Sequence, residues 1–436
     1  MNIITKNILY ITAFLTVSIR GFSQEKMTLN QAIEIALKNN LDIQITKNSL
    51  TVAGINNHIG VAGKLPTVTG TANTNEQITS LNQELSNGTT TNRNSVVSNN
   101  TNMGVTASML LYNGGRVIAT KKRLEELQHL SQDQLNATIQ NTIADVSVRY
   151  FTVVQQQNII GTLNQSIEVS KQKLALIEAR KSAGLSNDAE MLQAQLDLNN
   201  QIQALDNQQI IIEQSKYDLL RSLVLPPNSE INIKDSIVVD KALQWENIQV
   251  SLKNNPNLVT ADTQIGINKT IEREVFARRF PTVNLNTGYN YNLNQSSAGF
   301  TLLNQLFGPF LGINVSVPIY TGTNNIRQVR VAKINTENAK LQREVINQNL
   351  KNTAAKAWES YIGNLKLIEA EQRNYTLAQK LLSVITQRFQ LGQSTIIDVK
   401  QAQQSFENSG FRLNNLSYNA KIAEVTLKQL ANLLGN

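Results

Sequence analysis

Hydrophobic residues recur every seven positions along four stretches of the chain. A seven-residue repeat sustained over many turns is typical of helices that pack as coiled coils. Gly184 separates the first stretch from the second, and Gly392 separates the third from the fourth. The pattern therefore predicts two antiparallel helical hairpins, over about residues 116–224 and 324–434. The repeating positions are Ile139, Val146, Val153, Ile160, Ile167 and Leu174; Met191, Leu198, Leu205, Ile212 and Leu219; Ala354, Tyr361, Ile368, Tyr375 and Leu382; and Val399, Phe406, Leu413, Ala420 and Leu427.

Four other segments alternate apolar and polar residues with a period of two, which predicts β-strands with one apolar face. They lie at about residues 65–80, 102–112, 281–294 and 309–320. Tyr289 and Tyr291 stand on the apolar face, where they would contact lipid or a neighbouring copy of the chain. Asn, Gly and Pro on the other face suit a wet interior. The connection over residues 80–102 is rich in Asn, Thr and Ser and is expected to form an exposed loop.

The same unit is written twice along the chain. LKNNL at residues 37–41 returns as LKNNP at residues 252–256, and RKSAG ending at Gly184 is echoed by RFQLG ending at Gly392. Such echoes at a near-constant offset indicate an internal duplication. We predict repeat 1 over residues 24–230 and repeat 2 over residues 245–436, with a linker or equatorial segment at residues 231–244.

Each repeat has the same predicted order of elements. A helix comes first, at residues 28–63 with Thr28 as its N-cap and again at residues 241–279. Two strands and then the long hairpin follow. The change from strand to helix falls at matching residues of the two repeats, which are Tyr112 and Gly114 in the first and Tyr320 and Gly322 in the second.

Composition narrows the classes of function. The chain has 436 residues, no Cys and two His, so thiolate sites and disulfides are excluded and a histidine metal site is not expected. The formal charge of +8 is dispersed without a dense basic block, which argues against nucleic acid as a partner. No phosphate-binding glycine loop or nucleophile elbow occurs, so we expect neither a cofactor nor an enzyme.

The N-terminus predicts export. Lys6 precedes an apolar run at Ile8–Ile19, and small residues at Gly21 and Ser23 suit cleavage, so residues 1–23 are interpreted as a signal peptide. Beyond it, no apolar run is long enough for a transmembrane helix. Insertion into a membrane would therefore have to use the strands.

An acidic residue follows each hairpin glycine at a matching place. GQSTIIDVKQAQ after Gly392 contains Asp398, and GLSNDAEMLQAQ after Gly184 contains Glu190. From position alone, each acid is interpreted as a solvated charge or as a carboxylate stabilised near a helix N-terminus. Arg180 and Arg388, four residues before the glycines, would contact either helix carbonyls or a partner protein.

Four strands cannot close a barrel, and a sheet in a bilayer cannot leave its edges unpaired. Several copies of the chain must then pool their strands, and the helices continuous with those strands would extend the barrel into a tube. This reasoning predicts a conduit.

The export signal, the duplication, the strand–Tyr-x-Gly–helix junction and Arg-x-x-x-Gly followed by IIDV resemble the TolC-like outer-membrane efflux family. The resemblance covers nearly the whole mature chain. It implies an α+β membrane protein: a homotrimer with a twelve-stranded β-barrel in the lipid of the Gram-negative outer membrane, continuous with a coiled-coil tunnel in the periplasm. It also implies docking, through a periplasmic adaptor, onto an inner-membrane pump that exports small molecules or secreted polypeptides.

The resemblance also implies roles for single residues. The tips at Gly184 and Gly392 would form the periplasmic entrance, with Asp398 and Glu190 as a ring of negative charge at its constriction and Gln401 and Gln193 beside them. This chain departs from the family pattern at two places, because Gln401 stands where a second acid is typical and Ser394 where a basic residue is typical.

A second class of function stays open from the sequence: a secreted or periplasmic coiled-coil scaffold or adhesin that never enters a membrane. Such a protein would not need apolar residues in a two-residue alternation in all four strand segments. The strand pattern is therefore the discriminating feature.

Overall fold

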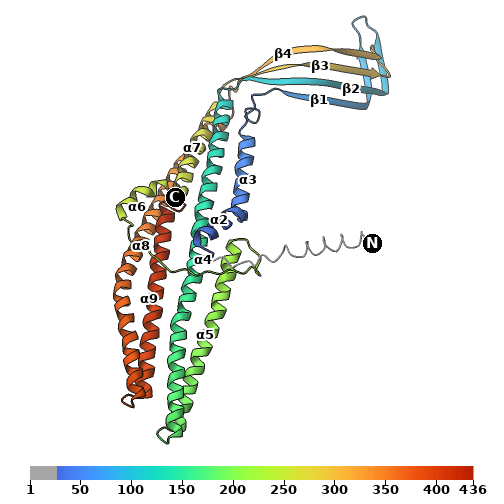
Figure 1. The fold of residues 1–436 in the computed structure, drawn as a ribbon. Coiled ribbons are helices and arrows are strands. Elements are labelled where there is room, and N and C mark those ends of the chain that lie inside the picture. The colour runs from blue at the N-terminus through green and yellow to red at the C-terminus, as the bar shows by residue number, and fades with distance from the viewer. Residues whose placement is uncertain (1–26, 436) are drawn as a thin grey trace, which may run out of the picture. The chain divides into compact units, whose positions relative to one another are not determined.

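The computed structural model describes residues 27–435, so the predicted signal peptide lies outside the described residues (Figure 1). The described chain forms two compact units, each built from both repeats. One unit comprises residues 27–45, 136–255 and 348–435, and the other comprises residues 46–135 and 256–347.

The second unit contains a four-stranded antiparallel sheet in the order β1-β2-β3-β4 (Figure 1). The strands are β1 (Thr67–Glu84), β2 (Thr90–Tyr112), β3 (Thr282–Ser296) and β4 (Leu303–Ser316). The two repeats meet in the middle, where β2 pairs with β3. Within the described chain β1 and β4 each have a single neighbour, so the sheet has two open edges.

The register of the strands separates an apolar face from a polar one. Directly paired residues share a face, and one such row across the sheet is Ala72, Met103, Tyr291 and Phe307. The adjacent row on the other face is Asn73, Asn102, Asn292 and Leu306, which is mostly amide. On the apolar face Tyr289 is 50% exposed and Phe307 is 65% exposed. A single chain therefore leaves a wide apolar surface uncovered.

The prediction of an exposed loop over residues 80–102 is wrong. β1 continues to Glu84 and β2 begins at Thr90, so only a short turn remains, with Gly88 at φ +82°. Backbone pairing to β1 holds the Asn- and Thr-rich segment in register despite its loop-like composition. Residues 90–93, 96 and 97 of β2 have ladder partners only on β1, so this hairpin extends beyond the other two strands.

The end of β4 also differs from the expectation. β4 covers Leu303–Ser316, so Tyr320 lies outside the strand. Pro318 has no N–H to donate to a ladder, which is consistent with the strand ending before it.

The N-terminal helix of each repeat is broken at the same repeat position. The first repeat has α2 (Leu29–Asn39) and α3 (Leu41–Asn56), and the second has α6 (Trp245–Ser251), a 3-10 turn η1 (Leu252–Asn254) and α7 (Pro256–Ala277). Asn40 has φ −58° and ψ 124°, and Asn255 has φ −59° and ψ 127°. The helical stretches expected at residues 28–63 and 241–279 are therefore each divided, because these two extended residues cannot continue a helix. Thr28 does cap α2, and it forms a capping box with Gln31.

The two hairpins have equal dimensions. α4 (Arg116–Ser182) and α8 (Asn324–Gln390) each have 67 residues, while α5 (Asp188–Ser222) and α9 (Ile396–Leu430) each have 35. None of the seven-residue positions is exposed, and those that are fully buried include Val146, Val153, Leu219, Ala354, Val399, Phe406 and Leu427. Among the helices of residues 27–435, none has a stretch both long and apolar enough to cross a membrane.

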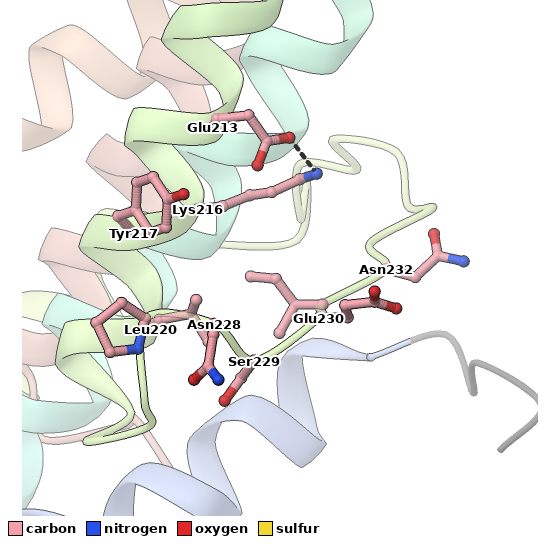
Figure 2. A pocket seen from close by; sticks show the side chains of 10 residues that line it. Glu213, Lys216, Tyr217, Leu220, Asn228, Ser229, Glu230 and Asn232 are labelled. Atoms are coloured by element: carbon pink, nitrogen blue, oxygen red, sulfur yellow. Dashed lines mark hydrogen bonds and ion pairs between the residues drawn. The ribbon is translucent and has the colours of Figure 1, made fainter.

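The connection between α5 and α6 is packed although it forms neither helix nor strand. Ile231 and Ile233 join a buried core with Tyr150 and Leu219. Beside it, a hollow of about 480 Å³ opens between α5 and residues 227–232, with the Lys216–Glu213 ion pair at 2.7 Å on its wall (Figure 2).

The strand-to-helix junction of repeat 1 depends on Gly114. This residue has φ +69°, and a Cβ added to it would lie 2.5 Å from the Cβ of Phe280 and 2.8 Å from the carbonyl oxygen of Ala277. The neighbouring Gly115 has φ +80°, but a Cβ there would meet nothing within 4 Å. Both glycines relieve backbone strain, and only Gly114 also allows a close approach of α7.

We expect Gly114→Ala to impair folding and membrane assembly far more than Gly115→Ala. Both changes place a Cβ on a left-handed residue, at a cost of about 1–2 kcal/mol, and only the first adds a clash with backbone and ring atoms. The yield of assembled protein and its thermal unfolding temperature would measure the difference. Equal losses in the two variants would contradict the close-packing role of Gly114.

Candidate functional site

The hairpin tips turn in the same way in both repeats. Gly184 has φ +72° and Gly392 has φ +76°. The amide after each glycine closes the turn, because Leu185 N donates to the Arg180 carbonyl at 2.8 Å and Gln393 N donates to the Arg388 carbonyl at 2.8 Å. This six-to-one bond with a left-handed glycine is the usual way to end a helix sharply.

Asp398 is the third residue of α9 and closes a capping box with Thr395. Its Oδ2 accepts hydrogen bonds from Thr395 N at 2.7 Å and from Thr395 Oγ1 at 2.8 Å, while its own N donates to Thr395 Oγ1 at 3.2 Å. The bond from the Thr395 backbone lowers the pKa of Asp398, and the bond from the Thr395 hydroxyl adds to this. The residue is exposed, so its negative charge faces solvent while its position is fixed.

Glu190 occupies the equivalent third position of α5. Asn187 caps this helix by accepting from Glu190 N at 2.9 Å, and Ser186 Oγ donates to the Glu190 carboxylate. The two acids are therefore matched in their place on the hairpin, but only the carboxylate of Asp398 accepts hydrogen bonds from its own N-cap residue. One turn later Gln193 donates to Asp197 at 2.9 Å, whereas Gln401 is exposed.

The two arginines before the turns have different contacts. Arg180 donates through Nη2 to the Phe389 carbonyl oxygen, and its guanidinium lies 4.9 Å from the centre of the Phe389 ring. It therefore joins the first hairpin to the second. Arg388 is exposed and donates through Nη2 to Gln393 O of its own turn at 3.3 Å. Arg180 thus reaches a carbonyl of the last turn of α8, whereas the carbonyl that Arg388 reaches lies in the turn beyond that helix.

The sequence reasoning missed a buried ion cluster close to the tips. Lys173 on α4 donates to Asp197 Oδ2 on α5 at 2.8 Å, and Lys400 on α9 donates to Asp197 Oδ1 at 2.9 Å. Lys173 is 2% exposed and Asp197 is 9% exposed. Burial alone would raise the pKa of Asp197, but the bonds from Lys173 and Lys400 outweigh it and hold that pKa below its usual value. The cluster ties three helices together across the two hairpins.

A second polar contact between the hairpins is also buried. Gln403 Nε2 on α9 donates to Ser166 O at 3.2 Å and to Ser170 Oγ at 3.1 Å on α4. Glu407 Oε1 accepts from Gln201 at 2.9 Å and from Gln403 at 3.2 Å. The hairpins are therefore held together near their tips by directional polar bonds as well as by apolar packing.

The sequence profile of a protein family described as "Outer membrane efflux protein" matches residues 32–223 and 247–433. The chain belongs to the outer membrane efflux protein family. The resemblance inferred from the sequence is thereby confirmed, and with it the role of an export conduit.

Relatives and solved structures agree with this membership. The outer membrane protein TolC of Vibrio cholerae is 21% identical over 315 residues, 70% of each chain, and the outer membrane efflux protein BepC of Brucella suis is 19% identical over 376 residues, 86% of this chain and 79% of the relative. The structure of the outer-membrane channel OprN matches with a TM-score of 0.78 at 16% identity, over 93% of this chain and 90% of the other. The outer membrane protein VceC of Vibrio cholerae matches with a TM-score of 0.74 at 17% identity, over 92% and 95%. The predicted fold class, with four strands per chain and long helices in two repeats, is confirmed.

We expect removal of the Asp197 carboxylate to destabilise the folded protein, because Lys173 would stay buried without its counter-charge. Asp197→Ala should lower the free energy of unfolding by about 3 kcal/mol. Lys400→Ala is the matched control: its side chain is 45% exposed, and its loss should cost less than about 1 kcal/mol. Denaturant unfolding of the purified protein, followed by circular dichroism, would measure both values, and equal losses would contradict the cluster's role.

The same cluster predicts a pH dependence. The pKa of Asp197 is lowered in the folded state, so its contribution to stability is complete above the unfolded value of about 3.9 and is lost as the pH falls through the folded value. The gap in stability between the native chain and Asp197→Ala should stay constant from about pH 8 to about pH 5 and close in stronger acid. A gap that shrinks already near neutral pH would argue against this carboxylate as its source.

Proposed function

We propose that three copies of this chain pool their sheets into a twelve-stranded barrel in the outer membrane, with the helical hairpins forming a tunnel on the periplasmic side. The observation that carries the proposal is the sheet itself. Its edge strands β1 and β4 are open in one chain, and its apolar face crosses all four strands. Unpaired backbone groups cost several kcal/mol each in hydrocarbon, so pairing β1 of one copy with β4 of the next satisfies both edges.

The polar face would line the interior of this barrel. Its Asn, Thr and Gly residues suit water, while the tyrosines and Phe307 on the opposite face suit lipid. A soluble scaffold would have no use for a broad apolar surface on its sheet, so the conduit explains the pattern better.

The conduit works with partners in this proposal. A periplasmic adaptor would contact the hairpin tips, where Arg388 and the turn glycines are exposed, and would connect them to an inner-membrane pump. The cargo would be small molecules, such as drugs and toxic compounds, or secreted polypeptides. The named function of the relatives in efflux supports this assignment.

The tips would form the entrance to the tunnel. In a trimer, Asp398 and Glu190 supply six carboxylates around one opening, and a narrow mouth of low dielectric focuses their negative potential. Thr395 holds each Asp398 in place, which limits how far that charge can move. Gln401 and Gln193, one turn further on, would add neutral polar groups beside the ring.

Membrane assembly is the first test. We expect the full chain to be recovered from the outer-membrane fraction as a trimer and to form ion channels in planar bilayers. Mass measurement of the detergent-solubilised protein and single-channel recording would show this. A soluble monomer in the periplasm would overturn the proposal and favour the scaffold.

The second test concerns the entrance charge. Asp398→Asn with Glu190→Gln keeps side-chain oxygens for the helix start and removes the charge, so we expect the cation-to-anion permeability ratio to fall several-fold. The matched control is Glu34→Gln with Glu246→Gln, two exposed acids on the short helices α2 and α6, which should leave the ratio unchanged. Reversal potentials under a salt gradient would measure the ratio.

The pH profile of selectivity adds a further readout. The pKa of Asp398 is lowered by its bonds from Thr395, so this carboxylate stays charged in acid that would already protonate a free Asp side chain. Thr395→Val removes the hydroxyl bond and should move the loss of selectivity to higher pH. If the permeability ratio responds neither to Asp398→Asn with Glu190→Gln nor to Thr395→Val, these acids do not lie at the entrance.

A further inference from the structure

A groove of about 510 Å³ lies at the strand-to-helix junction of repeat 1. The end of β2, the turn after α3 and the first turns of α4 form its walls. Its apolar lining includes Ile59, Leu111, Tyr112 and Ile118, which are 37%, 43%, 49% and 76% exposed. Beneath it, Ala62, Val117 and Leu124 form a small buried core that keeps the walls in place.

The rim of this groove is basic. Three lysines line it, Lys64, Lys121 and Lys122, against one acid, Glu125. Lys121 is held by Asn57 Oδ1 at 2.6 Å and Glu125 Oε1 at 2.9 Å. Lys122 lies 3.5 Å from Glu125 and 3.4 Å from Glu126 and has a half-exposed side chain, and Lys64 is exposed and forms no ion pair within residues 27–435. The rim therefore carries an excess of positive charge.

The groove is continuous with the apolar face of the sheet. Tyr112 pairs with Val283, and Val283 pairs with Val315, so these side chains form the last apolar row before the junction. If that face meets lipid, as the proposed function holds, an acyl chain beside the sheet can extend into the groove without crossing a polar surface.

The distribution of charged residues along the strands indicates where the groove would lie relative to the membrane surface. The charged residues of β1–β4 are Glu76, Glu84 and Arg93, which all lie toward the β1–β2 turn, far along the strands from the junction. At the junction end, the first charged residue beyond every strand is a cation. These four cations are Lys64 before β1, Arg116 after β2, Arg279 before β3 and Arg327 after β4. An uncharged apolar band whose next charged residues along the chain are all cations is the pattern of a membrane interface that faces lipid phosphates.

We propose that this groove binds an anionic glycerophospholipid of the periplasmic leaflet, with an acyl chain against Ile59, Leu111 and Ile118 and the phosphate between Lys64 and Lys122. The inference rests on the proposed membrane insertion of the sheet. Tyr112 would stand at the headgroup level, where amphipathic rings are favoured. The bound lipid would fill an apolar hollow next to Gly114 and so support the junction from which the tunnel begins.

The test compares lipid retention by the full assembled protein. The protein would be reconstituted with phosphatidylglycerol or phosphatidylcholine and examined by native mass spectrometry. We expect Lys64→Gln with Lys122→Gln to weaken retention of phosphatidylglycerol by about tenfold. The control is Lys366→Gln with Lys380→Gln, two exposed lysines of α8 outside the groove that change the charge equally and should have no effect. Equal retention in both double variants, or equal retention of the two lipids by the native protein, would overturn the inference.

A second measurement identifies what occupies the groove. A photo-crosslinking amino acid in place of the exposed Ile118 should react with phosphatidylglycerol in proteoliposomes. Crosslinking to a second copy of the chain instead would show that a neighbouring subunit covers the groove and would overturn the inference. Channel recordings on the same samples separate the two proposals: normal conductance with no lipid dependence rejects only the lipid site, whereas a protein that forms no channels rejects the conduit.

Discussion

The hydrogen-bonding groups at the outer edges of β1 and β4 impose the main constraint on this molecule. In water they could be solvated, but the apolar face that the sheet exposes is suited to hydrocarbon, where nothing else can satisfy them. In hydrocarbon, a single copy of the chain would thus leave the backbone groups of both edge strands without hydrogen-bond partners. α3 and α7 lead into β1 and β3, and α4 and α8 follow β2 and β4, so the pairing of the strands also sets the order in which these four helices begin or end beside the sheet.

Duplication explains much of the architecture, and the differences between the repeats are informative. The long helices have equal lengths, the turns close with the same bond, and Asn40 and Asn255 break their helices at the same dihedral angles. The polar ties are not duplicated. Of the two arginines before the turns, Arg180 bonds to the other hairpin and Arg388 to its own turn, and the Asp197 cluster takes its lysines from one helix of each repeat. The two repeats therefore share a backbone fold, but they contribute different side chains to the polar bonds between their hairpins.

The sequence predicted the parts of the fold that depend on local periodicity. The seven-residue positions such as Val146 and Phe406 are buried, and the alternation around Tyr291 does separate an apolar from a polar face. It failed where partners distant in sequence decide the outcome. The Asn- and Thr-rich part of β2 is a strand because β1 pairs with it, and Lys173, Asp197 and Lys400 look like ordinary solvated charges until three helices bring them together. At the tips, the position of Asp398 was visible from the glycine and the following pattern, but its bond to Thr395 required coordinates.

The overhang of the β1–β2 hairpin has a practical consequence. Its turn at Asn87 and Gly88 lies beyond the last residues of β2 that pair with β3. The ladder between β1 and β2 ends at Glu84 and Thr90, so the turn residues take no part in it. In the proposed orientation this turn is the part of the chain that stands furthest out from the cell surface. A short peptide inserted there would be displayed to antibodies on intact cells while leaving the strands that form the barrel wall unchanged, which makes the turn a natural handle for labelling the protein in living bacteria.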